Sequence, residues 1–179
     1  MSYVTEALKS DFRDLKIEFI TKGLSLPTPN IDRLRKGGNL IFDQKYWSII
    51  KSWKSKSTIT GSACLYAFGL LDRLPKDIDL LINKDDAKDI KLYKDHYPGM
   101  EDQFDLLGYY KECGYHVDLF HNTDHPIISV DGYNFHHPFE IIEVKILLSE
   151  HRGSSNKDFW DLQNIFKKIN PEYKSELVS

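Results

Sequence analysis

The sequence has few cysteines and no long apolar run, and both absences narrow the class of protein it encodes. Among its 179 residues there are two cysteines, Cys64 and Cys113, which form no CxxC pair. We therefore expect neither a disulfide framework nor a cysteine zinc site, and we expect a reducing compartment. No apolar run approaches the roughly 20 residues that span a bilayer, and the N-terminal stretch MSYVTEALKSDF lacks the apolar region of a secretory signal. A cytoplasmic protein with no membrane partner is expected.

The chain also lacks a strong excess of charge of one sign. Its formal net charge is -3 and its pI is about 6.2, which argues against a protein that coats nucleic acid without specificity. Hydrophobic residues make up 41% of the chain and charged residues 28%, so a sizeable core is available. This length and composition predict one globular domain, or a domain with a helical extension.

The order of apolar patterns and turn residues predicts a mixed α/β (α+β) fold, with a small mixed sheet and helices packed on it. Helices are expected over residues 3–22, 30–36, 44–54, 62–71, 84–99, 138–149 and 157–169, and strands over 57–60, 77–82, 115–122, 127–130 and 133–136. Residues 102–112 fit either a helix or a strand. Asp131-Gly132 is a strong hairpin signal between the last two strands. We predict an N-terminal helical extension (1–56), a main α/β domain (57–170) and a tail (171–179).

The stretch from Thr60 to Asn83 carries the clearest chemical pattern. Asp77 and Asp79 are separated by one residue in a predicted strand, so both carboxylates point to one side. Such a pair can hold Mg²⁺, with phosphate oxygens and water completing its coordination. Gly61-Ser62, at the start of the preceding helix, would let backbone amides and a hydroxyl approach a phosphate. Asp118, in the strand YHVDLFHN, is the third candidate carboxylate.

These residues resemble the DNA polymerase β-like nucleotidyltransferase superfamily: a glycine-serine turn, an aspartate pair and a later acid, with Arg73 before the pair. The segments PFEIIEVKILLSEHR and NKDFWDL resemble the lysine helix and the KDxxD-type element of the toxin-like AbiEii branch. The resemblance covers about Thr60 to Leu162. The chain is short for that branch, whose members often append a larger helical domain that contacts the acceptor.

The resemblance implies a magnesium-dependent transferase that moves NMP from an NTP to an acceptor hydroxyl, with Mn²⁺ as an alternative ion. The acceptor would be RNA such as tRNA, a protein or a small molecule, and an antitoxin protein is an implied partner. The implied metal ligands are Asp77, Asp79 and Asp118; the implied nucleotide-binding residues are Gly61, Ser62, Arg73, Lys145 and Lys157; the further implied catalytic residues are Lys145, Asp158 and Asp161. The alternative is a catalytically inactive nucleotide-binding or antitoxin-like module of the same fold.

Several of these residues also have simpler explanations. Arg73 can pair with a neighbouring acid, and Asp158 and Asp161 can complement the dipole at the start of a helix. Gly37-Gly38 lacks the spacing of a phosphate loop and is better explained as a helix end. The basic residues around Trp53 could bind an RNA backbone, but basic residues near the C-terminal end of a helix also complement its dipole.

Two other groups of residues invite a functional reading. The histidines, including His121, His125, His136 and His137, follow no zinc motif, and we assign no zinc. Four tyrosines could stack on a nucleobase, although core packing explains aromatic residues at such positions more simply; they are Tyr109, Tyr110, Tyr115 and Tyr133.

Overall fold

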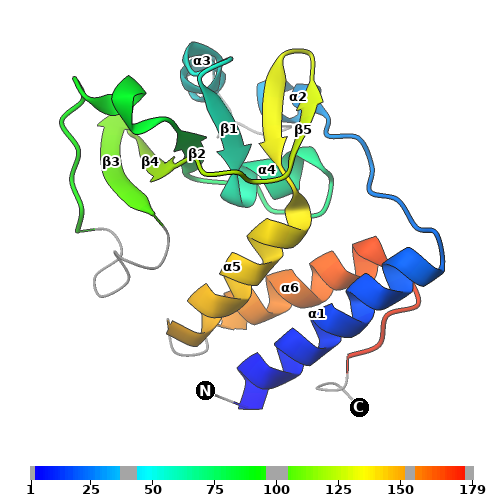
Figure 1. Ribbon diagram of the computed structural model, residues 1–179. Coiled ribbons are helices and arrows are strands. Elements are labelled where there is room, and N and C mark those ends of the chain that lie inside the picture. Colours follow the sequence, from blue (N-terminus) through cyan, green and yellow to red (C-terminus); the bar gives the residue numbers. More distant parts are fainter. Residues whose placement is uncertain (1–2, 37–43, 96–104, 152–155, 176–179) are drawn as a thin grey trace. The chain divides into compact units, whose positions relative to one another are not determined.

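The computed structural model describes residues 3–36, 44–95, 105–151 and 156–175 (Figure 1). The expected turns at Gly37-Gly38 and Pro98-Gly99 lie outside these ranges. By its internal contacts the chain forms two units, one of Met1–Thr28 with Pro138–Ser179 and one of Pro29–His137. This division does not follow the predicted ranges 1–56, 57–170 and 171–179. The first predicted helix belongs with the C-terminal helices, and residues 29–56 belong with the sheet.

The unit Pro29–His137 is a mixed α/β structure, as predicted. Its six strands are ordered β3-β4-β2-β1-β6-β5. They are β1 (Ser57–Thr60), β2 (Ile78–Ile82), β3 (Leu106–Glu112), β4 (Tyr115–His121), β5 (Ile127–Val130) and β6 (Tyr133–His136). The pairs β2/β4 and β1/β6 are parallel, whereas β1/β2, β3/β4 and β5/β6 are antiparallel.

One face of this sheet is apolar and covered by helices. Strand alternation places the following fully buried side chains on it: Ile78, Leu80, Ile82, Val117, Leu119 and Phe135. The unit's helices are α2 (Ile31–Lys36), α3 (Gln44–Ser52) and α4 (Gly61–Ala67). Tyr46 of α3 packs edge-on against Tyr115, and Phe68, next to α4, packs edge-on against Phe135. The opposite face of the sheet is therefore the one left for polar side chains.

The local turn chemistry agrees with the sequence in several places. Asp131 and Gly132 both have positive φ, as the predicted hairpin turn between β5 and β6 requires. The Asn30 side chain accepts a hydrogen bond from the Asp32 amide at 3.0 Å, so Asn30 caps α2, the helix expected over residues 30–36.

The predicted surface helix over residues 84–99 is wrong for its described part. Only a single 3-10 turn forms, η1 (Lys84–Ala87), capped by the side chain of Asn83. Ala87 is the buried residue of this turn, and most of the residues around it are polar. A helix without an apolar stripe gains little from packing, so the segment instead follows the sheet edge, where Tyr93 forms a bridge to Tyr109.

The other unit is helical and consists of α1 (Tyr3–Thr21), α5 (Pro138–His151) and α6 (Asn156–Ile169). Phe12 of α1 stacks on Phe166 of α6 with ring centroids 5.9 Å apart. Tyr173, in the predicted tail, donates a hydrogen bond to Asp11 at 2.6 Å, so this part of the tail is held against α1.

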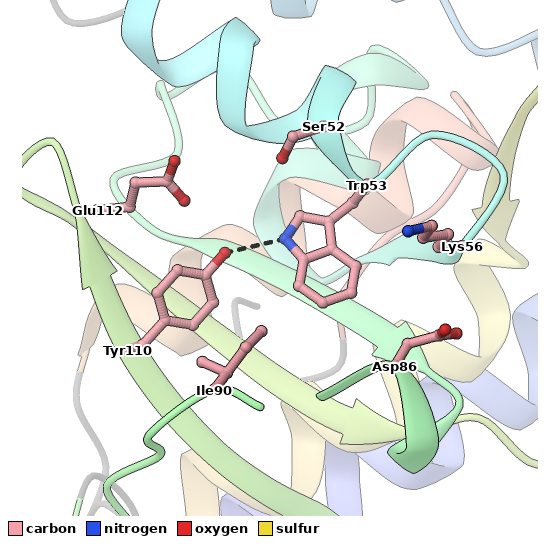
Figure 2. A pocket seen from close by; sticks show the side chains of 7 residues that line it. All are labelled: Ser52, Trp53, Lys56, Asp86, Ile90, Tyr110 and Glu112. Atoms are coloured by element: carbon pink, nitrogen blue, oxygen red, sulfur yellow. Dashed lines mark hydrogen bonds between the residues drawn. The ribbon is translucent and has the colours of Figure 1, made fainter. Parts of the chain in front are cut away.

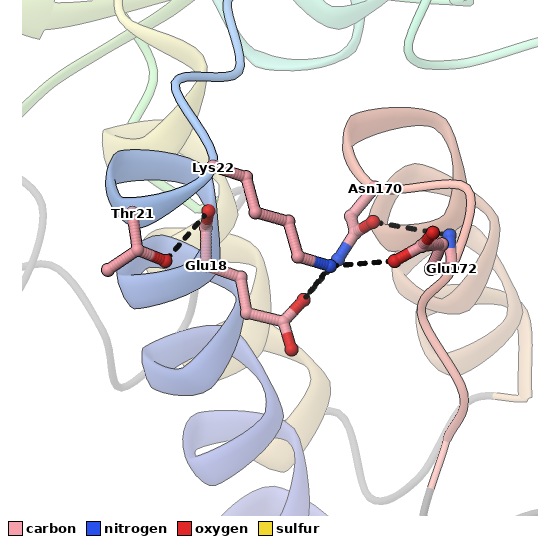
Figure 3. Close-up of polar contacts among 5 residues, drawn as sticks. All are labelled: Glu18, Thr21, Lys22, Asn170 and Glu172. Atoms are coloured by element: carbon pink, nitrogen blue, oxygen red, sulfur yellow. Dashed lines mark hydrogen bonds and ion pairs between the residues drawn. The ribbon is translucent and has the colours of Figure 1, made fainter.

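Polar contacts also join the ends of α1 and α6 (Figure 3). Lys22 bridges Glu172 at 2.7 Å and Glu18 at 3.6 Å, and Asn170 donates to Glu18. The side chains of Lys22, Glu18 and Glu172 are exposed, so these ion pairs add little to stability, whereas Asn170 is buried. None of the described helices combines the length and apolar character that a membrane crossing needs.

Candidate functional site

The polar face of the sheet brings the three predicted acids together. Asp79 of β2 and Asp118 of β4 are Cα partners in neighbouring parallel strands. Partners in a sheet point to the same face and lie about 4.8 Å apart, so their carboxylates are neighbours. Asp77 lies in the bend just before β2, near enough for its charge to contribute to the raised pKa of Asp118. Residues distant in the sequence thus form one carboxylate cluster within a single unit.

The acids differ strongly in exposure. Asp77 is exposed, Asp79 is half-buried and Asp118 is fully buried. The pKa of Asp118 is raised from 3.8 to about 9, mainly by burial, with smaller contributions from the neighbouring Asp79 and from the charge of Asp77. Asp118 therefore holds a proton at neutral pH when no cation is present. A divalent cation would reverse this preference, because it favours the ionised carboxylate.

Gly61 is the residue that lets Asp79 fit beside the end of β1. Its φ is +63°, and a Cβ placed on it would stand 2.0 Å from Oδ2 of Asp79. No side chain larger than hydrogen is compatible with this arrangement. Gly61 therefore has a definite steric role in the carboxylate cluster, and Ser62, half-buried in the first turn of α4, follows it directly.

The polar face extends beyond the acids to a histidine that the sequence analysis did not select. Thr60 is the Cα partner of Asp79, and its Oγ1 lies 2.8 Å from Nδ1 of His136 in β6. The Thr60 side chain makes no capping bond to α4. A polar row thus runs across neighbouring strands from His136 through Thr60 and Asp79 to Asp118. Thr60 and His136 are 76 residues apart and Asp79 and Asp118 are 39 residues apart, so no local motif could have revealed this row.

Tyr46 supports the acid cluster from α3. It is fully buried, and its hydroxyl donates to the backbone carbonyl of Asp77 at 3.1 Å. Burial raises its pKa, and the charges of Asp79 and Asp77 raise it further, so it remains a neutral donor. This contact joins residues 31 positions apart, so no local sequence pattern predicts it.

The basic and acidic residues predicted near the C-terminus form a separate cluster in the helical unit. Nζ of Lys145 lies 3.1 Å from Asp158 and 3.3 Å from Asp161. All three side chains are largely buried. The structure therefore brings Lys145 together with the two aspartates of the KDxxD element, whereas the neighbouring Lys157 is exposed.

Arg73 lies in the connection between α4 and β2 and is half-buried. Its predicted role at the nucleotide remains a prediction, as does that of Lys157.

A pocket of about 380 Å³ opens on the apolar side of the sheet rather than on the acid side (Figure 2). Its aromatic part is Trp53, whose Nε1 donates to the hydroxyl of Tyr110 at 2.9 Å. Tyr110 is adjacent in β3 to Tyr109, the partner of Asp118, so it points to the opposite face. The remaining lining residues are Ser52, Lys56, Asp86, Ile90 and Glu112. This pocket is therefore not part of the carboxylate cluster.

Comparison with known proteins adds no family assignment: no family model, no curated protein and no solved structure matches the chain. The functional argument therefore depends on the geometry of the chain itself.

Proposed function

We propose that the protein is a metal-dependent nucleotidyltransferase, which moves NMP from an NTP to an acceptor hydroxyl. The observation that carries this proposal is the in-register pairing of Asp79 with Asp118 directly beside Gly61-Ser62. Three carboxylates on one face, with a backbone turn that only glycine permits, provide a place for cations and a triphosphate together.

The donor set fits a hard divalent cation such as Mg²⁺ or Mn²⁺. Asp77, Asp79 and Asp118 offer carboxylate oxygens, which these ions prefer to imidazole or thiolate. The buried Asp118 lies beside Asp79 and, because its pKa is raised to about 9, holds its proton in the metal-free protein. When bound, the ion would neutralise charge on the phosphate oxygens and lower the pKa of the acceptor hydroxyl.

The chain's own groups would position the reactants. In the reaction, a bond forms between the acceptor oxygen and the α-phosphorus, the bond to the pyrophosphate oxygen breaks, and the hydroxyl proton passes to water. Catalysis of this kind consists mainly of in-line positioning and charge neutralisation. Ser62 would contact the leaving phosphates through its hydroxyl, and Arg73 would supply positive charge there.

The charged cluster of Lys145, Asp158 and Asp161 has a secondary role in this proposal. Lys145 is held by Asp158 and Asp161, so its ammonium group is already paired within the helical unit. We therefore assign Lys145, Asp158 and Asp161 to acceptor handling or to stability of that unit. An experiment must identify the acceptor among tRNA, other RNA, proteins and small molecules. The same holds for an antitoxin partner.

One observation favours a second candidate, a catalytically silent module of the same fold. Asp118 is fully buried beside Asp79 and its pKa is raised to about 9, and a neutral buried carboxyl group is stable without a cation. In this alternative the cluster is a structural element, and any nucleotide binding is independent of Mg²⁺.

Labelled nucleotides distinguish the two candidates. The protein is incubated with Mg²⁺, total RNA, a small-molecule cell extract and each NTP labelled either at the α- or at the γ-phosphate, and the RNA, protein and small-molecule fractions are then separated. The transferase predicts transfer of the α-label only, and its loss in Asp79→Asn. Transfer of the γ-label would identify a kinase, and absence of any Asp79-dependent transfer would support the silent module.

A further inference from the structure

Two histidines of the sheet unit are held in a similar way, each by a threonine. Nδ1 of His136 lies 2.8 Å from Oγ1 of Thr60, and Nε2 of His125 lies 2.8 Å from Oγ1 of Thr123. The two imidazole rings meet edge to face, with centroids 4.9 Å apart. Each threonine thus occupies one ring nitrogen and leaves the other nitrogen for a further ligand.

The second ring nitrogen of His136, Nε2, has an unusual environment. His136 is 5% exposed, and its Nε2 is buried without a hydrogen-bond partner among the described residues. A buried polar atom without a hydrogen-bond partner lowers stability by about 1 to 3 kcal/mol, so in native proteins such atoms nearly always have a partner. Ligand nitrogens of His125 and His136 lie within 4.8 Å of each other. His125 is half-buried in the connection between β4 and β5.

We propose that His125 and His136 bind one divalent transition-metal ion of the Zn²⁺ class. The two imidazoles supply two ligands, and water or another oxygen donor supplies the rest. Thr60 and Thr123 act as the outer partners that orient each ring, as the second nitrogen of a metal-bound histidine usually requires. Imidazole favours Zn²⁺, Co²⁺ and Ni²⁺ over Mg²⁺, which separates this pair from the carboxylate cluster.

The pair escapes motif searches because its parts lie on different strands and loops. The histidines do not have the spacing of a zinc motif, which is why the sequence analysis assigned no zinc. The pair does not depend on the proposed transferase activity. Thr60 nevertheless links it to the acids, because the same residue is the Cα partner of Asp79.

Cobalt titration tests the pair directly. Co²⁺ is added to the full-length protein in excess Mg²⁺, and its visible absorption is followed; Zn²⁺ is then added as a competitor. We expect saturation at one equivalent, displacement by Zn²⁺, and loss of the signal in His125→Ala. Thr60→Val should weaken binding about 10- to 100-fold, the usual effect of removing an outer partner.

Two control variants and a second test variant keep the result interpretable. His151→Ala removes an exposed histidine of α5 and should bind Co²⁺ as the wild type does. Asp79→Asn should also bind normally, since the acids are not ligands of this ion. His136→Asn is a second test of the pair if its circular dichroism spectrum is native. Co²⁺ binding that survives in His125→Ala, that requires Asp79, or that fails to saturate in the wild type overturns the proposal.

Discussion

Gly61 and Asp79 approach so closely that a methyl group on Gly61 would stand 2.0 Å from a carboxylate oxygen of Asp79. This distance is far inside van der Waals contact, and φ of +63° at Gly61 adds backbone strain for any other residue. The turn after β1 and the acid on β2 therefore have to be considered as one structural feature. A change at either residue displaces the other.

Gly61→Ala should destabilise the protein by about 2 to 4 kcal/mol, because the positive φ and the steric clash both oppose the new methyl group. Urea denaturation measures the change. Gly69→Ala is the matched control: Gly69 has φ +74°, but nothing lies within 4 Å of its Cβ position. The Gly69→Ala variant should lose about 1 kcal/mol of stability, because only the positive φ opposes its new methyl group.

Asp79→Gly in the Gly61→Ala background completes this comparison. Removing the Asp79 side chain relieves the clash, so the double variant should recover part of the lost stability. Strictly additive losses would show that the two residues do not press on each other in solution.

Asp118 gives the protein a characteristic dependence of stability on pH. Because the pKa of Asp118 is raised to about 9 in the folded protein, the folded state keeps a proton that the unfolded state has lost above about pH 4. Stability from this group therefore falls as the pH rises between about 4 and 9, by up to about 1.4 kcal/mol per pH unit.

Asp118→Asn removes this slope. In metal-free buffer the variant should gain stability relative to the wild type as the pH rises from 5 to 8.5, and urea denaturation at several pH values measures the difference. Mg²⁺ should stabilise the wild type most at high pH and leave the variant nearly unchanged. A stability difference that is the same at every pH contradicts the buried, protonated carboxyl group.

Lys145 holds two buried carboxylates in the helical unit, and Lys145→Met should leave them uncompensated. The expected loss is about 3 to 5 kcal/mol, as for other broken buried ion pairs. Lys16→Met is the control, because Lys16 pairs with Glu143 at 3.2 Å on the surface of the same unit. It should cost less than about 1 kcal/mol. Equal losses in the two variants would mean that the Lys145 cluster is effectively solvated.

Much of the fold could be predicted because its signals are local. Asp131-Gly132 specified the hairpin, and Asn30 specified the start of α2. The end of α4 carried a signal that was overlooked: the helix was expected to reach Leu71 but ends at Ala67, where Gly69 adopts positive φ and the amide of Leu70 bonds to the carbonyl of Leu65. This is the usual glycine-terminated helix end.

Other elements depend on contacts that no local pattern contains. Residues 102–112 fitted a helix or a strand equally, and pairing with β4 makes Leu106–Glu112 the edge strand β3. The same limit applies to the site. Strand alternation predicted that Asp77 and Asp79 share a side, but the register of β2 with β4 places Asp118 beside Asp79. The contact of Thr60 with His136 likewise depends on the pairing of β1 with β6.

Counting bound Mn²⁺ by electron paramagnetic resonance tests the carboxylate cluster most directly. The spectrum of free Mn²⁺ is followed as the ion is added to the wild type and to Asp79→Asn, each with a non-hydrolysable NTP. The account predicts Mn²⁺ binding to the wild-type complex beyond that of the nucleotide alone, and its loss in Asp79→Asn. Equal binding by the two proteins would contradict it.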